Sequence, residues 1–396
     1  MNTVAHHRRI VGDLVGGGRT TTVDLASAVG LVLASPVAAE HDLPMFDNSA
    51  VDGFAVRTAD LHAGGGRTAL TVVDVVAAGD SRVLSLGAGE AMQIMTGAAT
   101  PLNADRIVPV EQTAGFDACS VDRQVEFVSE PDSGNNIRRC GEDIGIGSVV
   151  VRPGTVLTPR SVAALAALGL AAVDVYAPPR VLVLSTGSEL RPQGTTLRHG
   201  HIFESNAVML CAAIREAGAQ AIQLLSVSDD ISSFHRALDP YLSEIDLIVT
   251  TSGVGVGAFE VVRQATEGEG VQFTTVGMKP GRPQGAGMYR GVPLVAFPGN
   301  PVSAYISFEV FLRARLRDIM GYRDIERRHE PVALSTPLPK RAGVRQFLLA
   351  GIVDGKFEPL GSGSSSSLSS LMACEGLLEV DDGVGMADRA VAWSLS

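Results

Sequence analysis

Apolar runs with strand character alternate with helical patterns between about residues 181 and 320, and this alternation constrains the fold more than any other feature of the sequence. The run VLVLSTG begins with continuous apolar residues, which is typical of a strand buried on both faces. Further strands are predicted in AIQLLSVSDD, DLIVTTSG, VQFTTVGMKPG and VPLVAFPG, and helices in residues 205–217, SSFHRALDPYL, AFEVVRQAT and VSAYISFEVFLRARLRDIM. Strands that alternate with helices predict a mostly parallel sheet in a doubly wound domain.

The rest of the chain predicts three further domains, so the fold class is a multidomain α/β protein. Short β-rich runs without a long helix mark residues 45–137, and the stretches on either side both contain helical patterns. The clearest is TPRSVAALAALGL, where Thr158 stands as a cap and Pro159 opens the helix. The expected ranges are a linking domain of residues 1–44 and 138–176, a β-rich inserted domain of 45–137, a doubly wound domain of 177–322 and a small C-terminal β domain of 323–396.

Composition excludes several classes of function. The formal net charge of -11 disfavours nucleic-acid binding, which favours basic surfaces. The sequence has no apolar run long enough to cross a bilayer and no apolar signal-peptide core, so we expect a cytoplasmic protein without a membrane partner. The four cysteines form no CxxC pair and are expected to be ordinary thiols, at Cys119, Cys140, Cys211 and Cys374.

Polar loops follow the predicted strands of residues 181–320. Ligands bind beyond the carboxyl ends of parallel strands, so these loops are expected to share one crevice. They are STGSEL at 185–190, SDD at 228–230, TSGVGVGAFE at 251–260, MKPGRP at 278–283 and PGNPVS at 298–303.

Two of these loops have the character of anion-binding turns. Gly253, Gly255 and Gly257 let backbone N–H groups approach a ligand closely, and the helix that follows adds its positive dipole end. A tight turn between strand and helix is the alternative explanation of this spacing. In PGNPVS, Asn300 stands at a cap position and Pro301 at the first helical position.

Carboxylates stand beside these turns, at Glu189, Asp229, Asp230 and Glu260. Carboxylates repel phosphate unless a cation lies between them, and Mg²⁺ uses one or two carboxylates together with phosphate oxygens. The sequence therefore predicts a magnesium site, with Glu189 and Glu260 favoured as ligands. For Asp230 a helix cap is the favoured role.

Lysine is rare in this chain, with only Lys279, Lys340 and Lys356. Lys279 beside Arg282 predicts a small anion pocket, with a surface cation as the alternative. The β-rich domain adds polar residues among apolar ones, at Asp47, Asn48, Ser49, Asp52 and Thr96. A turn at Asp52-Gly53 is the simpler explanation there, and a homodimer could bring these residues to the crevice from a second subunit.

Seven stretches of the sequence resemble, in order and spacing, motifs of the MoeA-like molybdopterin molybdenumtransferases, which are related to the E domain of gephyrin. The stretches are DNSAVDGFAVR, MTGAATPLNAD, NIRRCGEDI, STGSEL, TSGVGVGAFE, MKPGRP and FPGNPVSA. The resemblance covers nearly the whole chain. It implies an elongated, four-domain homodimer that inserts molybdate into adenylylated molybdopterin with Mg²⁺ and releases AMP. It also implies that the active cleft combines the doubly wound domain of one subunit with the β-rich domain of the other.

The resemblance extends to individual residues. It implies catalytic roles for Asp52, Thr96, Glu189, Asp229, Lys279 and Arg282, and metal ligands at Glu189, Asp229 and Glu260. Substrate-binding candidates are Arg138, Asp143, Thr186, Gly187, Ser252, Gly253, Gly255, Gly257, Pro298, Gly299, Asn300, Pro301 and Ser303. Glu260 replaces a commoner aspartate, Arg282 a commoner lysine and Ser365 a commoner histidine, while Arg345 and Ser370 are further candidates for oxyanion binding.

Two other functions fit the same features. The doubly wound domain could adenylylate molybdopterin, as its single-domain relatives do, or the chain could be a non-catalytic scaffold. A molybdopterin adenylyltransferase is also an expected partner, since it would deliver the substrate.

Overall fold

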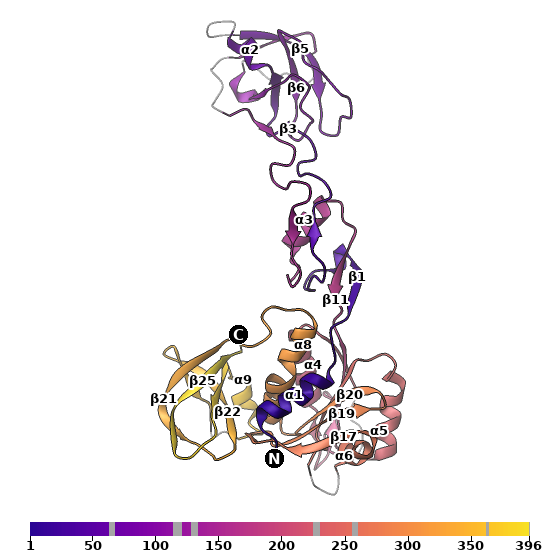
Figure 1. The fold of residues 1–396 in the computed structure, drawn as a ribbon, viewed down its shortest axis with the longest axis vertical. Helices are drawn as coiled ribbons and strands as arrows, with labels where there is room; N and C mark the ends of the chain where they lie inside the picture. The colour runs from indigo at the N-terminus through magenta and orange to yellow at the C-terminus, as the bar shows by residue number, and fades with distance from the viewer. Residues whose placement is uncertain are drawn as a thin grey trace. The chain divides into compact units, whose positions relative to one another are not determined.

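The structure is a computed structural model that describes residues 1–62, 68–113, 121–127, 134–224, 230–255, 260–361 and 364–395. The chain forms two compact units, the first of residues 1–35, 153–158 and 172–396 and the second of residues 36–152 and 159–171. Figure 1 shows both units, which are described here one at a time. Within the described residues, every helix is too short or too polar to span a membrane.

A six-stranded sheet forms the centre of the first unit, with the strand order β15-β12-β16-β20-β19-β17. The first four strands are parallel, β19 runs antiparallel to its neighbour β20, and the edge strand β17, antiparallel to β19, again has the direction of the first four. Alternate residues of β12 face opposite sides, Val181 and Val183 one way and Leu182 and Leu184 the other, and all four are fully buried. The strands are β12 (Arg180–Ser185), β15 (Gln220–Gln223), β16 (Leu247–Thr251), β17 (Val271–Thr275), β19 (Pro283–Tyr289) and β20 (Val292–Phe297).

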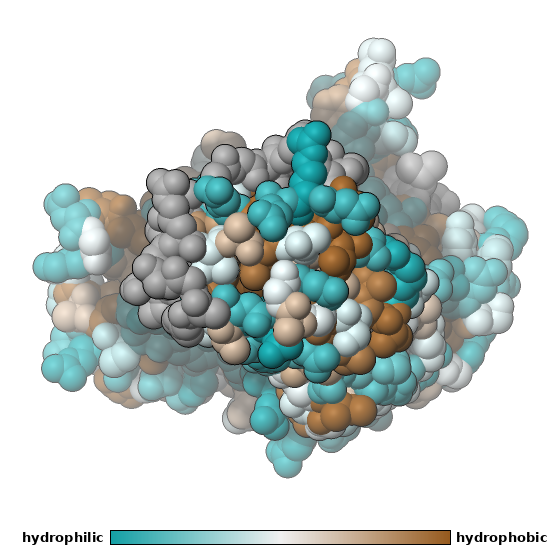
Figure 2. All heavy atoms as spheres, turned by 90° about the horizontal axis from the view of Figure 1, so that it is seen from above, coloured by the Kyte–Doolittle hydropathy of each residue, from teal (hydrophilic) through white to brown (hydrophobic). Residues whose placement is uncertain are grey.

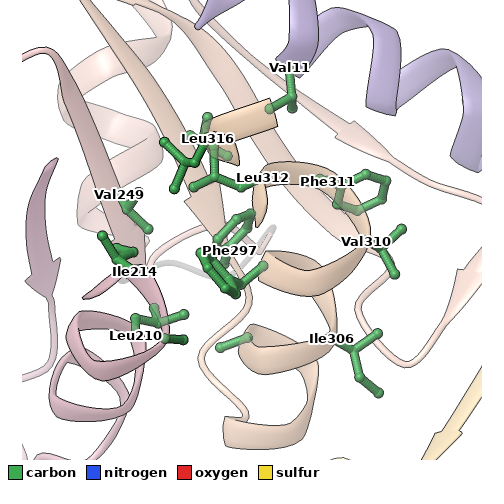
Figure 3. Packing of buried hydrophobic residues seen from close by; sticks show 14 of the residues in the cluster. Val11, Leu210, Ile214, Val249, Phe297, Ile306, Val310, Phe311, Leu312 and Leu316 are labelled. Carbon is green, nitrogen blue, oxygen red and sulfur yellow. The ribbon is translucent and has the colours of Figure 1, made fainter. Parts of the chain in front are cut away.

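Helices cover both faces of this sheet, so the predicted doubly wound, mostly parallel architecture is confirmed. Figure 3 shows side chains of one face packed together, including Val11, Leu210, Val249 and Phe297. This face is covered by α1 (Val4–Leu14), α4 (Asn206–Glu216), α7 (Pro301–Ser307), the π-helical turn η5 (Phe308–Arg313) and α8 (Ala314–Ile319). The other face is covered by α5 (Ile231–Leu238), with the 3-10 turn η3 (Asp239–Tyr241), and by α6 (Val261–Thr266), with η4 (Glu267–Glu269).

The amino-terminal helix α1 belongs to this core. Thr3 caps it by accepting a hydrogen bond from the backbone N–H of His6, and its buried residues Val4, His7 and Val11 follow helical spacing. The helix lies against η5, where the ring of His7 meets that of Phe311 edge-on with centroids 4.7 Å apart. Residues 4–14 therefore pack against one face of the six-stranded sheet's core.

The segment VQFTTVGMKPG was expected to be one strand, but it contributes to two sheets. β17 ends at Thr275 in the six-stranded sheet, and β18 (Met278–Lys279) pairs with β22 (Arg345–Val353) of the C-terminal sheet. That sheet has the order β18-β22-β24-β25-β21, and β23 also pairs with β22. Its other elements are β21 (His329–Pro339), β23 (Lys356–Pro359), β24 (Gly376–Val380), β25 (Met386–Ser394) and the short helix α9 (Leu368–Met372).

Short elements complete the first unit. The antiparallel pair β1 (Thr20–Asp24) and β11 (Ala172–Tyr176) and the 3-10 turn η1 (Leu25–Ser27) lie near the points where the chain enters and leaves it. The parallel pair β13 (Leu190–Arg191) and β14 (Ile202–Phe203) lies beyond the end of β12.

A five-stranded sheet dominates the second unit, as predicted for a β-rich domain, with the order β7-β4-β6-β5-β8. Its members are β4 (Gly53–Val56), β5 (Thr68–Val76), β6 (Glu90–Ile94), β7 (Arg106–Pro109) and β8 (Gln124–Phe127). The unit also contains β2 (Val37–Ala38) with β10 (Val149–Val151), β3 (Asn48–Ser49) with β9 (Ile137–Arg138), the helices α2 (Thr58–His62) and α3 (Pro159–Ala167), and the 3-10 turn η2 (Val110–Gln112).

Two further sequence expectations can be compared with the structure. Pro159 opens α3 as predicted. The three described cysteines, Cys140, Cys211 and Cys374, are free, and Cys119 lies outside the described residues.

The view from above shows hydrophilic and hydrophobic residues interleaved on the surface (Figure 2). The four domain ranges stay a prediction.

Candidate functional site

A pocket of about 1110 Å³ lies beyond the carboxyl ends of the parallel strands in the first unit. Four of the five loops predicted for the crevice contribute to its wall, and the fifth, at 228–230, is described only at Asp230. The predicted residues that line it are Glu189, Ser252, Gly253, Gly255, Glu260, Lys279, Arg282, Pro298, Gly299, Asn300, Pro301 and Ser303. Asp229 and Gly257 lie outside the described residues.

The glycines of TSGVGVGAFE allow side chains to approach the backbone closely. A Cβ on Gly255 would lie 2.5 Å from Oε1 of Glu260, and one on Gly253 would lie 3.1 Å from Oγ1 of Thr186. Gly253 also has φ of +69°, which L side chains rarely adopt. The loop therefore needs glycine both for its conformation and for the position of the Glu260 carboxylate.

A network of hydrogen bonds ties the turn PGN to the end of β16. The side-chain amide of Asn206 donates to the carbonyl oxygen of Gly299 over 2.6 Å and to Oγ1 of Thr251 over 3.1 Å. Thr251 in turn donates to the carbonyl oxygen of Pro298 over 3.1 Å. These bonds fix the floor of the pocket, where Asn206 and Thr251 are buried.

Glu189 and Glu260 both line the pocket, as their predicted role as metal ligands requires. The Glu189 carboxylate lies over Gly187, because a Cβ there would come within 2.6 Å of Oε2. Glu260 stands at the cap position of α6 but its side chain makes no capping hydrogen bond. Among the described residues, no three His, Cys, Asp or Glu side chains come together closely enough to form a metal site by themselves.

Asp230 caps α5, which confirms the role favoured from the sequence. Its carboxylate accepts hydrogen bonds from the backbone N–H of Ser233 and from the hydroxyl of Ser232, over 2.8 and 2.7 Å. These bonds, first that of the Ser232 hydroxyl, lower the pKa of Asp230 to about 2.

Lys279 and Arg282 both reach the pocket and are both exposed. Asn300 occupies the cap position of α7 but makes no capping bond; its amide donates instead to Oγ of Ser365 over 2.8 Å. A serine of the C-terminal domain is thereby fixed at the pocket wall. Ser303 is buried in the first turn of α7.

Arg345 and Ser370, the two further oxyanion candidates, are not brought to the wall of this pocket. The Arg345 guanidinium forms ion pairs with Glu379 and Asp381, over 2.8 and 3.0 Å. The hydroxyl of Ser370 lies 2.8 Å from that of Ser367. Two carboxylates therefore already neutralise the charge that Arg345 would offer an anion.

Four predicted residues, Asp52, Thr96, Arg138 and Asp143, belong to the second unit. Oδ1 of Asp52 accepts hydrogen bonds from the backbone N–H and the hydroxyl of Thr96, each over 2.7 Å, and the backbone bond is the main cause of the lowered pKa of Asp52. The structure thus joins two residues that the sequence separates by 44 positions. Arg138 lies in β9 opposite Asn48 of β3, and the side chains of Arg138 and Asp143 are exposed.

Glu204 was missed by the sequence analysis. It lines the pocket, is 6% exposed, and its Oε1 accepts hydrogen bonds from the Ser185 hydroxyl and the backbone N–H of Ala207. Glu204 therefore satisfies a backbone N–H at the start of α4, where Ser205 occupies the cap position without a side-chain capping bond. The only sequence signal is a charged residue directly before this cap, which is common at exposed helix starts and does not reveal burial.

Comparisons with known proteins match nearly the whole chain. Residues 2–169 match the MoeA N-terminal region (domain I and II), residues 182–318 a probable molybdopterin binding domain, and residues 331–389 the MoeA C-terminal region (domain IV). The chain is 42% identical to molybdopterin molybdenumtransferase 2 of Mycobacterium tuberculosis over 97% of this chain and 96% of that protein. It is 33% identical to the molybdopterin molybdenumtransferase of Bacillus subtilis, over 89% and 84%.

A solved structure of the molybdopterin biosynthesis MoeA protein from Pyrococcus horikoshii covers 100% of this chain and 99% of its own, with a TM-score of 0.80 and 26% identity. The sequence relatives and the solved structure both match this chain over most or all of its length. The chain therefore belongs to the MoeA family of molybdopterin molybdenumtransferases.

Proposed function

We propose that this protein, a transferase of molybdenum cofactor biosynthesis, inserts molybdate into adenylylated molybdopterin in a Mg²⁺-dependent reaction that releases AMP. One observation carries the proposal: a single pocket is lined by the carboxylates of Glu189, Glu204 and Glu260, a glycine turn and two cations. The adenylylated substrate is rich in phosphate charge, and molybdate is a small oxyanion. Both ligands therefore match the charges of this wall.

The carboxylates of Glu189 and Glu260 fit a magnesium ion whose coordination shell is completed by the substrate. Glu189 and Glu260 lie on the same pocket, and neither side chain has a hydrogen bond or ion pair within the described part of the chain. Mg²⁺ characteristically takes one or two carboxylates and fills its remaining positions with water and phosphate oxygens. Glu189 and Glu260, with Asp229 as the third expected ligand, would hold the ion. When bound, it would supply charge neutralisation at the pyrophosphate.

The chain's own residues bind and orient both substrates. The backbone N–H of Gly253 offers a donor to phosphate, the start of α7 adds its dipole, and Lys279 and Arg282 place positive charge for molybdate. No side chain has to act as a covalent nucleophile. Asp52 and Thr96, which are hydrogen-bonded to each other, together with Arg138 and Asp143, are proposed to complete the cleft from the second subunit of a homodimer.

AMP release tests the proposal directly. Purified protein incubated with adenylylated molybdopterin, Mg²⁺ and molybdate should form AMP, and chelation of Mg²⁺ should stop it. Glu189→Gln should lower the rate strongly, while the exposed Glu40→Gln, far along the chain from the pocket loops, should not.

Each rival function gives a different result. ATP turnover with molybdopterin in the absence of molybdate would support an adenylyltransferase instead. Absence of AMP above the Glu189→Gln background, with the protein folded, would support a scaffold. An adenylyltransferase partner is proposed as the source of the substrate, and its presence should raise the rate only at limiting substrate.

A further inference from the structure

Glu204 carries a buried carboxylate oxygen without a partner. Its Oε1 accepts both hydrogen bonds described above, from Ser185 over 2.8 Å and from the backbone of Ala207 over 2.7 Å. Its Oε2 is buried and has no hydrogen-bond partner among the described residues. Because a buried polar atom without a partner is destabilising, a native protein that keeps one on a pocket wall has a reason to keep it.

Asn206 carries a second acceptor of the same kind, two residues further on. Its Nδ2 donates to the carbonyl oxygen of Gly299, which can only accept, so the orientation of the amide is fixed. Its Oδ1 is buried and has no hydrogen-bond partner within the part of the chain that the structure describes. Glu204 and Asn206 both line the pocket, and both are more than nine-tenths buried. The floor therefore offers two hydrogen-bond acceptors and needs donors from a ligand.

Two apolar residues that come directly before Glu204 in the sequence form part of the pocket wall. Ile202 and Phe203, which form β14, line the same pocket and are 55% and 44% exposed. Large apolar side chains that remain exposed beside polar groups are typical of binding sites for flat ring systems.

We propose that Glu204 and Asn206 recognise the amino-pyrimidinone edge of the pterin ring, which lies against Ile202 and Phe203; this inference rests on the proposed function. That edge presents a ring N–H and an exocyclic amino group side by side, so it offers adjacent donors. The adenine of the AMP moiety instead offers its amino group next to a ring acceptor, which would face an acceptor of the protein. The acceptor pair therefore favours the pterin end of the substrate.

Pterin and lumazine form a matched pair of probes, because lumazine carries an oxygen in place of the 2-amino group. Direct fluorescence titration of the full-length protein should show pterin binding roughly 10- to 100-fold more tightly than lumazine. Glu204→Gln keeps an oxygen for Ser185 and Ala207 but places an N–H₂ group at the position of Oε2. This variant should reduce the preference to about threefold or less and leave AMP affinity unchanged.

Phe203→Ser serves as a second variant, because it changes an exposed residue and should weaken both probes equally. Equal affinity of the wild type for pterin and lumazine, or the same preference in wild type and Glu204→Gln, would overturn the assignment. Loss of AMP affinity in Glu204→Gln would also overturn it, by placing adenine on these acceptors. The titrations need no turnover, so they are independent of whether AMP is released.

Discussion

Replacing His7 with leucine is expected to remove a pH-dependent loss of stability. His7 is 1% exposed in α1 and packs edge-on against Phe311, and in the described ranges of the chain neither of its ring nitrogens has a hydrogen-bond partner. Burial, and to a smaller extent the neighbouring His6, lowers the pKa of His7 from 6.5 to about 4. Leucine has a similar size and carries no polar atom that needs a partner.

The direction and size of the effect follow from proton linkage. Between pH 6.5 and 4 the unfolded chain binds a proton at this histidine and the folded chain does not, so stability falls as the pH falls through this range. The two pKa values correspond to a loss of about 2 kcal/mol at pH 5 and about 3 kcal/mol at pH 4 and below. At pH 7.5 the contribution is close to zero.

Urea denaturation at a series of pH values from 7.5 to 4.5 measures this effect. The difference in unfolding free energy between His7→Leu and wild type should increase by about 2 kcal/mol from pH 7.5 to pH 5. The exposed His199→Gln should show no such increase. Parallel curves for His7→Leu and wild type would refute the reasoning, since they would mean that His7 is protonated in the folded protein.

Three further predictions concern the pocket. Gly255→Ala, whose Cβ would lie 2.5 Å from Oε1 of Glu260, should displace that carboxylate and raise the Mg²⁺ concentration needed for AMP release; Gly12→Ala, with open space around it, is the control. Lys279→Ala should raise the molybdate requirement in an AMP-release titration while the affinity for adenylylated molybdopterin persists, and equal losses of both would contradict the anion role. Asn300→Ala should cost about 0.5–1 kcal/mol in thermal unfolding by removing the bond to Ser365, and adding Ser365→Ala should cost little more.

The doubly wound core could be predicted because its signals are local. The β16 run Leu247–Thr251 is apolar or β-branched throughout and fully buried, and the same strand leads into the glycine turn. Parallel strands bring their carboxyl ends to one edge, so the loops with Glu189, Glu260 and Lys279 could be placed together before any contact was known.

Other features depend on tertiary contacts that leave little trace in the sequence. β19 was not predicted, since Gly285 and Gly287 weaken its strand propensity. Both glycines are required by neighbours: a Cβ at Gly285 would lie 2.7 Å from Phe273, and one at Gly287 would lie 2.2 Å from the carbonyl oxygen of Gly270. The burial of Glu204 likewise depends on β12 and α4 meeting there.

The ion-pair partners of a charged side chain are equally difficult to predict from the sequence. Arg345 has the residue type for an oxyanion site, but its pairing with Glu379 and Asp381 depends on how β22 and β24 align. In contrast, the capping role of Asp230 involves residues two and three positions away, and local sequence is enough to predict it.

β18 links two sheets through the residues that line the pocket. Lys279 is hydrogen-bonded into the C-terminal sheet, and four residues later the chain enters β19 of the six-stranded sheet. The C-terminal domain is therefore not an independent appendage. A shift of one sheet against the other would move Lys279 relative to the glycine turn, so loosening the packing of the C-terminal domain should impair anion binding in the pocket.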